Sequence, residues 1–432
     1  MSTRLLRRAA PIALLTALAA PPAAGQQADD VSITVPEGFR AQVFATDLGR
    51  ARHIAVTGDG RVYVALREPD QGGSIAALRD EDGDGRADTV RYFGGHDGGT
   101  GIAVHDGWLY ASSNREVMRW RLPDDGLVPE GEPEVIATGF PEQEQHAAKA
   151  FTIDGQGNLF VNVGAPSNAC QEETRTLHSP GLNPCPQLDR HAGVWRFDAD
   201  RTGQSQQAAE RHATGIRNIV ALDTHPATGE VWFAMHGRDQ LDALWPEQYT
   251  NDQNARLPDE EFHPLVQGAD YGWPYNYWDA ERELRMAAPE YGGTGDLPAP
   301  DADEYREPAL AFPAHWAPND LLFQSASRFP EEYRDGAFIA FHGSWNRSPF
   351  PQQGYKVVFV PFRDGRPAQD WRVFADGFAG PRDPAHPNEA RYRPMGLAQG
   401  PDGSLFITDS QTGRIWKVSA EPPVAGENRD GS

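Results

Sequence analysis

Arginine stands beside asparagine, tryptophan or tyrosine at three separate places in this 432-residue chain: Arg217-Asn218, Trp345-Asn346-Arg347 and Arg391-Tyr392-Arg393. A guanidinium group presents a planar fork of N–H donors that pairs with a carboxylate through two hydrogen bonds. Three such loops converging on one point would therefore bind a single anionic ligand. The alternative is that each group forms a separate salt bridge on the surface.

His146 is the candidate general base. It stands in Glu144-Gln145-His146-Ala147-Ala148-Lys149, just before a pair of strand-like segments. A neutral imidazole can accept a proton from an alcohol near neutral pH. A single histidine is more often structural than catalytic, so both interpretations stay open on the residues alone.

Four aspartates have the spacing of a calcium loop. Carboxylates at positions 1, 3, 5 and 9, with glycine at position 6, supply oxygen ligands on a tight turn; here they are Asp80, Asp82, Asp84 and Asp88. The glutamate expected at position 12 is absent, because Arg91 stands there. The pattern predicts a structural calcium site, and a solvated acidic turn is the alternative.

A glycine-rich segment, Gly94–Gly101, superficially resembles a nucleotide-binding loop. No helical pattern follows it, so the dinucleotide interpretation fails and a loop at the mouth of a larger β structure is favoured.

The elements that must position these residues are short strands in a repeat. Turn residues followed by an alternating strand with an aromatic residue recur six times, beginning near Gly58, His105, Asp154, Thr228, Arg334 and Pro401. A period near 45 residues with three or four strands per unit is typical of β-propellers. The chain is therefore predicted to be all-β, a six-bladed propeller over residues 32–420 with inserted loops on blades four and five. A pair of β-sandwiches is the alternative.

The two ends of the propeller domain are expected to share a blade. The strand-like segments Phe39–Phe44 and Trp416–Val418 would pair and close the ring. Residues 421–432 are predicted to be a flexible tail.

Charge and the N-terminal segment restrict partners and compartment. The formal charge of −23 argues against nucleic acid and anionic membranes as partners. Residues 1–25 combine arginines with a short apolar run and are predicted to be a secretory signal peptide, with twin-arginine export as an alternative at Arg7-Arg8. No later segment has the length of apolar sequence needed to span a membrane. A periplasmic or secreted protein is expected.

Cys170 and Cys185 are the two cysteines of the chain. In an oxidising compartment they are expected to form a local disulfide; a metal pair would need further cysteine or histidine ligands nearby.

Several longer sequence segments resemble those of the soluble pyrroloquinoline quinone (PQQ)-dependent glucose/sorbosone dehydrogenase family of six-bladed propellers. They are Gly215-Ile216-Arg217-Asn218, Tyr271-Gly272-Trp273-Pro274, His342-Gly343-Ser344-Trp345-Asn346-Arg347-Ser348-Pro349 and Arg391-Tyr392-Arg393. The resemblance runs from Pro36 to about Val418. Gly-Ser-Trp-Asn-Arg and the aspartate loop resemble the sorbosone-dehydrogenase-like branch.

The resemblance implies a PQQ- and Ca²⁺-dependent oxidation of a sugar, polyol or sugar aldehyde, with electrons passed to a separate acceptor. It implies that His146 is the catalytic base and that Arg217 polarises the quinone beside Asn218. The backbone carbonyls of Gly237 and Arg238 would bind the calcium ion. The remaining cofactor contacts implied are Asn346 and Arg347, in place of the family's lysine, and Arg391 and Arg393.

Two acidic residues of the glucose-oxidising relatives are replaced here. Gln145 stands where an aspartate precedes the histidine, and Ala165 stands where a second aspartate orients it. Asn162, Ser167 or Asn168 is expected to orient His146 instead; weak activity is the alternative. His96 or Thr100 is expected to replace a glutamine of the second blade.

Two other functions remain open: a calcium-dependent propeller hydrolase of lactones or esters, and a propeller that has lost the cofactor and only binds a partner or glycan. Within Thr214–Trp278, we expect Tyr271–Pro274 to support the blade and Asp259-Glu260-Glu261 to be a solvated insertion.

Overall fold

Six sheets, each built on four antiparallel strands, follow one another within residues 32–325 and 328–421, which are the residues that the computed structural model describes; two of the sheets carry a short extra strand. These residues belong to the compact unit over Val31–Ser432. The predicted signal peptide at 1–25 and all but Glu421 of the predicted tail lie outside the described residues.

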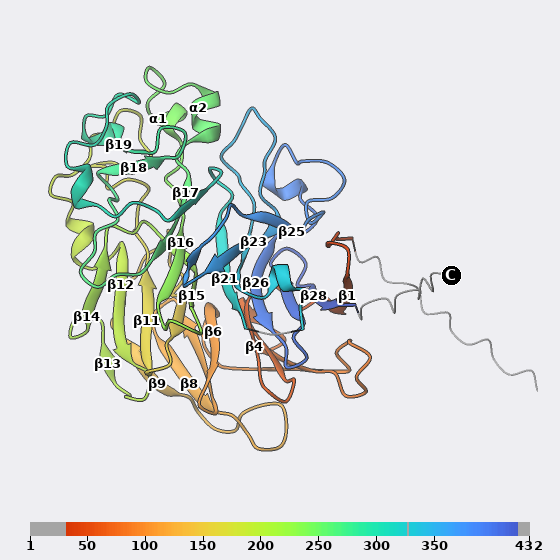
Figure 1. Cartoon of the computed structure of the whole chain (residues 1–432). Helices are drawn as coiled ribbons and strands as arrows, with labels where there is room; N and C mark the ends of the chain where they lie inside the picture. Colours follow the sequence, from red (N-terminus) through yellow and green to blue (C-terminus); the bar gives the residue numbers. More distant parts are fainter. Residues whose placement is uncertain (1–31, 326–327, 422–432) are drawn as a thin grey trace, which may run out of the picture. The chain divides into compact units, whose positions relative to one another are not determined.

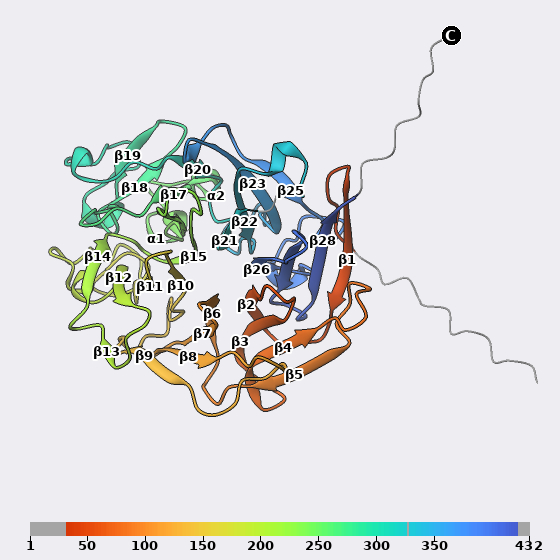
Figure 2. The same ribbon diagram turned by 60° about the horizontal axis from the view of Figure 1, so that its bottom comes forward.

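Each sheet is one blade, and the predicted six-bladed propeller is confirmed (Figure 2). Blade one contains β2 Ala51–Val56, β3 Val62–Asp70, β4 Gly73–Arg79 and β5 Thr89–Phe93, and blade two contains β6 Gly99–His105, β7 Trp108–Ser113, β8 Val117–Arg121 and β9 Glu134–Thr138. Blade three contains β10 Phe151–Ile153, β11 Asn158–Val163, β12 Gly193–Asp198 and β14 Glu210–Thr214, and blade four contains β15 Ile219–Thr224, β16 Val231–Met235, β17 Glu260–Pro264 and β20 Leu310–Phe312. Blade five contains β21 Pro318–Gln324, β22 Gly336–Phe341, β23 Lys356–Arg363 and β25 Arg372–Ala375, and blade six contains β26 Pro394–Gln399, β27 Leu405–Asp409, β28 Ile415–Ala420 and β1 Phe39–Ala45.

Short elements complete the list. Strand β13 Gln204–Ser205 pairs in parallel with β9, and β24 Arg366–Pro367 pairs with β23. The 3-10 turns are η1 Pro186–Asp189, η2 Pro289–Tyr291, η3 Ala302–Glu304, η4 Glu331–Tyr333 and η5 Pro387–Glu389. None of the helices in the described part of the chain is long and apolar enough to cross a membrane.

The ring closes as predicted, because the first strand of the domain completes the last blade. Phe39 lies opposite Ala420 and Val43 lies opposite Trp416 in the β1–β28 ladder. Pairing the two ends of the chain protects the edge strand that an open ring would leave.

The hydrophobic core is divided into layers between neighbouring blades. Strands such as β3 and β22 are buried on both faces, since each blade is covered by another on either side. The layer between blades five and six, for example, contains Phe338, Phe374 and Trp416. The short apolar strands of the repeat therefore serve to stack the blades.

Blade four carries the largest insertion, in agreement with the sequence prediction. Helices α1 Leu241–Leu244 and α2 Asn251–Arg256 lie between β16 and β17, and the hairpin of β18 Asn276–Asp279 and β19 Leu284–Ala287 lies between β17 and β20. Figure 1 shows these elements together beyond one end of the blades. On blade five, residues 342–355 connect β22 to β23.

Strand direction decides which loops meet. In an antiparallel blade, the connection from the fourth strand to the next blade and the connection from the second strand to the third lie at the same end. Residues 139–150, 164–192, 215–218, 236–259, 342–355 and 376–393 are all connections of these two kinds. Most of the residues predicted to do chemistry therefore lie at one end of the propeller.

Candidate active site

The ring of His146 is oriented by a backbone carbonyl. His146 lies in the connection between β9 and β10, and its Nδ1 is 2.7 Å from the carbonyl oxygen of Ala165. Nδ1 must carry the proton to donate this bond, which leaves Nε2 with a lone pair. The predicted orienting residues Asn162, Ser167 and Asn168 are therefore wrong. The carbonyl comes from the residue that stands where an aspartate was expected.

His146 is held neutral. Burial, reinforced by the charge of Arg217, lowers the pKa of His146 to about 3. A neutral imidazole with a bare Nε2 is the form that accepts a proton.

Arg217 lies close enough to His146 for its charge to lower the pKa of the imidazole, and it is anchored by Asp239 and Asn168. Its Nη2 donates to Asp239 Oδ2 at 2.8 Å and to Asn168 Oδ1 at 3.0 Å, and its Nε donates to the Asn168 carbonyl at 3.2 Å. Its Nη1 makes no hydrogen bond within the described part of the chain. The buried guanidinium is thus fixed by two groups and keeps one nitrogen for a ligand.

Asn218 belongs to a second network of polar side chains. Its Oδ1 accepts from Asn162 Nδ2, and its Nδ2 lies 3.3 Å from His236 Nδ1. His236 Nε2 in turn donates to the carbonyl of Pro318 at 2.7 Å. Burial lowers the pKa of His236 to about 4, so this ring is also neutral.

Gly164 allows the strand end and the two loops to meet. A Cβ atom at this position would lie 2.6 Å from His146 Cβ and 2.7 Å from Asn218 Oδ1. Only a residue without a side chain fits there.

The peptide that follows strand β16 offers two unused oxygens. The carbonyls of Gly237 and Arg238 accept no hydrogen bond from any described residue, whereas the Gly237 N–H donates to Glu260 Oε2 at 2.8 Å. The Arg238 side chain is turned away into an ion pair with Glu290 at 2.5 Å. Backbone carbonyls are the hard oxygen donors that suit calcium.

Glu260 and Glu261 are buried, so the prediction of a solvated acidic segment is wrong. Both lie on β17, which the hairpin β18–β19 covers; Glu261 pairs with Arg285 from that hairpin at 2.7 Å. Glu260 accepts from the N–H groups of Gly237 and Ala317, and burial raises its pKa to about 8. Glu260 therefore holds the Gly237 backbone in place, and Glu261 holds the hairpin against β17.

A cluster of arginines lies on the blade-six side of the same end. Arg393 donates from Nε and Nη2 to the carbonyls of His342 and Gly343 at 3.0 and 2.8 Å. Arg52, from β2, donates from Nε to Thr100 Oγ1 at 3.0 Å. The Arg67 side chain, from β3, is exposed and makes no hydrogen bond or ion pair with the described residues.

The charges of Arg67 and Arg393 act on Arg52. Burial and the charges of Arg67 and Arg393 lower the pKa of Arg52 to about 9, and Asp320 is the acidic neighbour that opposes them. His236 experiences the charges of both Arg52 and Arg217. The arginine cluster and the Arg217 network are therefore close enough for both to act on His236.

Arg52 and Arg67 were not predicted as site residues. Each is an isolated arginine in a strand, without an accompanying motif. The sequence feature that could have identified Arg52 is its place at the start of a mostly apolar inner strand, Arg52-His53-Ile54-Ala55.

The other predicted cofactor contacts are Asn346, Arg347 and Arg391. Arg347 donates to the carbonyls of Ala255 and Pro351, which fastens its loop to α2. Asn346 is buried, and its Nδ2 has no hydrogen-bond partner among the described residues. Arg391 is exposed, with its guanidinium 5.1 Å from the ring centre of Tyr392. Of the predicted stand-ins, Thr100 contacts Arg52, whereas His96 bonds Ser74.

Trp273, in the segment predicted to support the blade, donates from Nε1 to the Asn168 carbonyl at 3.0 Å. The predicted disulfide is present: Cys170 and Cys185 are bonded within the 164–192 connection. The Trp273 bond holds Asn168, which in turn accepts two hydrogen bonds from Arg217.

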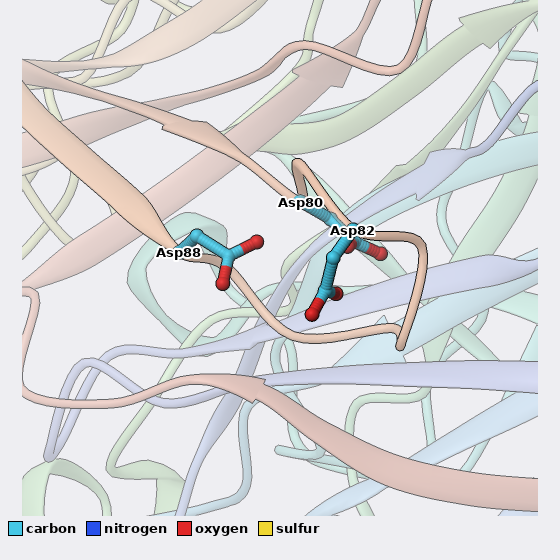
Figure 3. Close-up of side chains that lie close together, drawn as sticks. All are labelled: Asp80, Asp82 and Asp88. Carbon is cyan, nitrogen blue, oxygen red and sulfur yellow. The ribbon is translucent and has the colours of Figure 1, made fainter.

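The aspartate loop is the connection between β4 and β5, at the end of the propeller opposite to His146. Side-chain oxygens of Asp80, Asp82 and Asp88 lie within 4.8 Å of one another (Figure 3). Asp84 lies outside this group and accepts from the Arg86 N–H at 2.8 Å.

Comparison with known proteins agrees with this architecture. A family model described as TrAA12-like matches residues 33–421. An uncharacterized protein of Borreliella burgdorferi is 29% identical over 415 residues, which cover 90% of this chain and 91% of that protein. A PQQ-dependent pyranose dehydrogenase of Coprinopsis cinerea is 30% identical over 125 residues, which are 26% of this chain and 16% of that enzyme.

Solved structures with the same fold include two whose descriptions name PQQ. The holo PQQ domain of the Coprinopsis cinerea pyranose dehydrogenase has a TM-score of 0.71 and 20% identity, covering 90% of this chain and 97% of that one. A calcium structure of a Trichoderma reesei family AA12 protein has a TM-score of 0.72 and 19% identity, covering 91% and 98%. A PQQ-bound aldose sugar dehydrogenase of Streptomyces coelicolor has a TM-score of 0.54 and 15% identity, covering 89% and 99%.

Proposed function

The chain belongs to the TrAA12-like family, and on that premise we propose that it is an oxidoreductase that uses PQQ and Ca²⁺ to oxidise a sugar, polyol or sugar aldehyde. The substrate is a small molecule that enters at the end of the propeller where His146 lies.

The observation that carries the proposal is the cluster of Arg52, Arg67 and Arg393. Burial and the charges of Arg67 and Arg393 lower the pKa of Arg52, and Asp320 is the acidic neighbour that opposes them. Bringing like charges together is unfavourable unless an anion joins them. PQQ is a planar tricarboxylate, and arginine forks are suited to its carboxylates.

The donor set beside Arg217 fits the remainder of the cofactor. Arg217 Nη1 and Asn218 would contact the quinone oxygens, and the unused carbonyls of Gly237 and Arg238 would hold calcium. Asn346 Nδ2, buried without a partner, is a further donor for the ligand. When bound, the quinone would accept two electrons from the substrate, and the calcium ion would act as a Lewis acid.

His146 would serve as the general base. Its Nε2 is unprotonated because Nδ1 donates to Ala165, and the low pKa keeps it so over the physiological range. It would accept the proton of the substrate hydroxyl. Arg217, fixed by Asp239, would stabilise negative charge on the quinone oxygen that it contacts.

The arrangement gives less support to a propeller hydrolase. That chemistry needs side-chain carboxylates around a central ion. Among the described residues, the group of three or more acidic, histidine or cysteine ligands that could hold a metal is the loop with Asp80, Asp82 and Asp88. That loop lies at the other end of the blades.

We further propose that the aspartate loop binds a structural calcium ion between β4 and β5. We also propose that the protein is exported, with residues 1–25 as signal peptide and the propeller domain at 32–420. The disulfide supports an oxidising compartment. Electrons would leave to a separate acceptor, and residues 421–432 would form a tail.

Reconstitution tests the function. The purified apo-protein is mixed with PQQ and Ca²⁺, and the absorption spectrum of bound quinone is followed while aldoses, sorbosone or polyols are added. We expect stoichiometric uptake and bleaching by at least one sugar. Failure to take up PQQ in the presence of Ca²⁺ would overturn the proposal.

Two variants sharpen the experiment. His146→Ala should bind PQQ nearly as the wild type does, yet lose about 10²–10⁴-fold in kcat, the usual contribution of a general base. Arg52→Gln should instead weaken PQQ binding, because it removes a carboxylate partner. Uptake without reduction by any sugar would indicate a propeller that binds but does not turn over.

A further inference from the structure

The loop that carries His146 is held by two side chains that the proposed mechanism does not use. His146 has a φ of +51°, a left-handed conformation that non-glycine residues rarely adopt. Such a conformation costs free energy and persists where surrounding contacts enforce it.

Those contacts come from Gln143 and Lys149. Gln143 Nε2 lies 2.7 Å from the carbonyl oxygen of Gln145 and 3.1 Å from that of His146. Lys149 Nζ donates to the carbonyl of Ala147 at 2.5 Å. Three consecutive carbonyls of the loop are thus bound by side-chain donors.

The same two residues connect the loop to its surroundings. Gln143 Nε2 also lies 3.0 Å from the carbonyl oxygen of Gly164, the residue before the one that orients the imidazole. Lys149 lies two residues before β10, and its ammonium group is 6.0 Å from the ring centre of Phe140. The loop is therefore fastened to the end of β11 and to the start of β10.

Lys149 is costly for the fold. Its side chain is fully buried, and it has no carboxylate partner among the residues that the structure describes. Burial lowers its pKa to about 8. An unpaired buried ammonium group destabilises the folded state, so its position calls for a function other than stability.

We propose that Gln143 and Lys149 are positioning residues for His146: together with the Ala165 carbonyl they hold the loop and the imidazole so that Nε2 faces the substrate. They take the place of the two aspartates that the glucose-oxidising relatives place around this histidine. The inference rests on the proposed role of His146 as base.

The experiment uses the full-length exported protein and the variants Lys149→Met and Gln143→Met, which keep side-chain length and remove the donor. Lys356→Met, on blade five, and Gln267→Met, on the exposed surface of blade four, are the matched controls. The first readout is ¹⁵N NMR of the histidine rings in cofactor-free protein, with His146→Ala to assign the signal. The second is steady-state kinetics after loading with PQQ and Ca²⁺.

In the wild type and the controls we expect one neutral His146 tautomer, with the proton on Nδ1. In Lys149→Met and Gln143→Met we expect mixed tautomers or a broadened ring signal, and a kcat at least tenfold lower with KM changed less than threefold. Lys149→Met should unfold at the same temperature or higher, since it removes a buried charge. Lower turnover without lower stability is not expected of a merely structural residue.

An unchanged tautomer and an unchanged kcat in both folded variants would overturn the proposal. If Lys149→Met does not fold, Gln143→Met decides, because its donor contacts the His146 carbonyl itself. If the loaded wild type turns over no sugar, the proposed function fails, and the NMR comparison still decides whether the two residues position the ring.

Discussion

At the scale of single residues, the site shows how a backbone group can replace a side chain. A carboxylate beside the imidazole would orient it and also raise its pKa, as charge partners do. The Ala165 carbonyl fixes the same tautomer without a full negative charge. Burial and Arg217 then determine the pKa of His146, which is lowered to about 3.

This gives a prediction for pH. The His146 ring in the cofactor-free protein should stay neutral down to about pH 4, whereas an ordinary histidine titrates near 6.5. Because the folded-state pKa lies below the unfolded value, this group favours folding above pH 6.5, and the contribution is lost as the pH falls from 6.5 toward 3. A ring titration by NMR checks it; a midpoint near 6.5 would contradict it.

At the scale of elements, the site depends on how closely the end of β11 approaches two loops. Gly164 is the point of contact with both His146 and Asn218. Neighbouring side chains on loops can shift by tenths of an ångström, but here the closest atom is a Cβ that moves only with its backbone.

Gly164→Ala should therefore displace the His146 loop. We expect a loss of stability of about 1–3 kcal/mol, as for overpacking, and a fall in sugar oxidation of about tenfold or more. Chemical denaturation and kcat of the loaded enzyme measure the two effects. Gly155→Ala is the control in the same blade, because nothing lies within 4 Å of its added Cβ; equal behaviour of the two variants would refute the close contact.

At the scale of the whole domain, the ring is held shut by a strand from the other end of the chain. Phe39, on β1, packs edge-on against Phe329, Tyr333 and Phe374 with centroid distances of 4.9, 5.3 and 5.0 Å. It thus connects the closing blade to blade five. All loops of the site depend on this closure, since they come from different blades.

Phe39→Ala should destabilise the domain by about 3–5 kcal/mol, the usual cost of removing a buried phenylalanine side chain. The midpoint of urea unfolding measures it. Phe350→Ala, at a site 38% exposed, is the control and should change the midpoint little. Similar midpoints for wild type and Phe39→Ala would mean that β1 does not hold the ring.

The sequence by itself determined the six blades, their closure by the chain ends and the disulfide, because these follow from local turn chemistry, a repeated strand pattern and cysteine count. The resemblance to known proteins also led us to propose His146, Arg217-Asn218, Gly237-Arg238 and Arg393 as site residues. The tertiary structure alone decided the partners: Ala165 for His146, Asp239 for Arg217, and Arg52 and Arg67 beside Arg393. It also buried Glu260 and Glu261, which looked solvated in the sequence. The physical reason is that two side chains interact only when they lie within hydrogen-bonding or charge-pairing distance. Residues on strands that are far apart in the chain come that close only when the ring has closed.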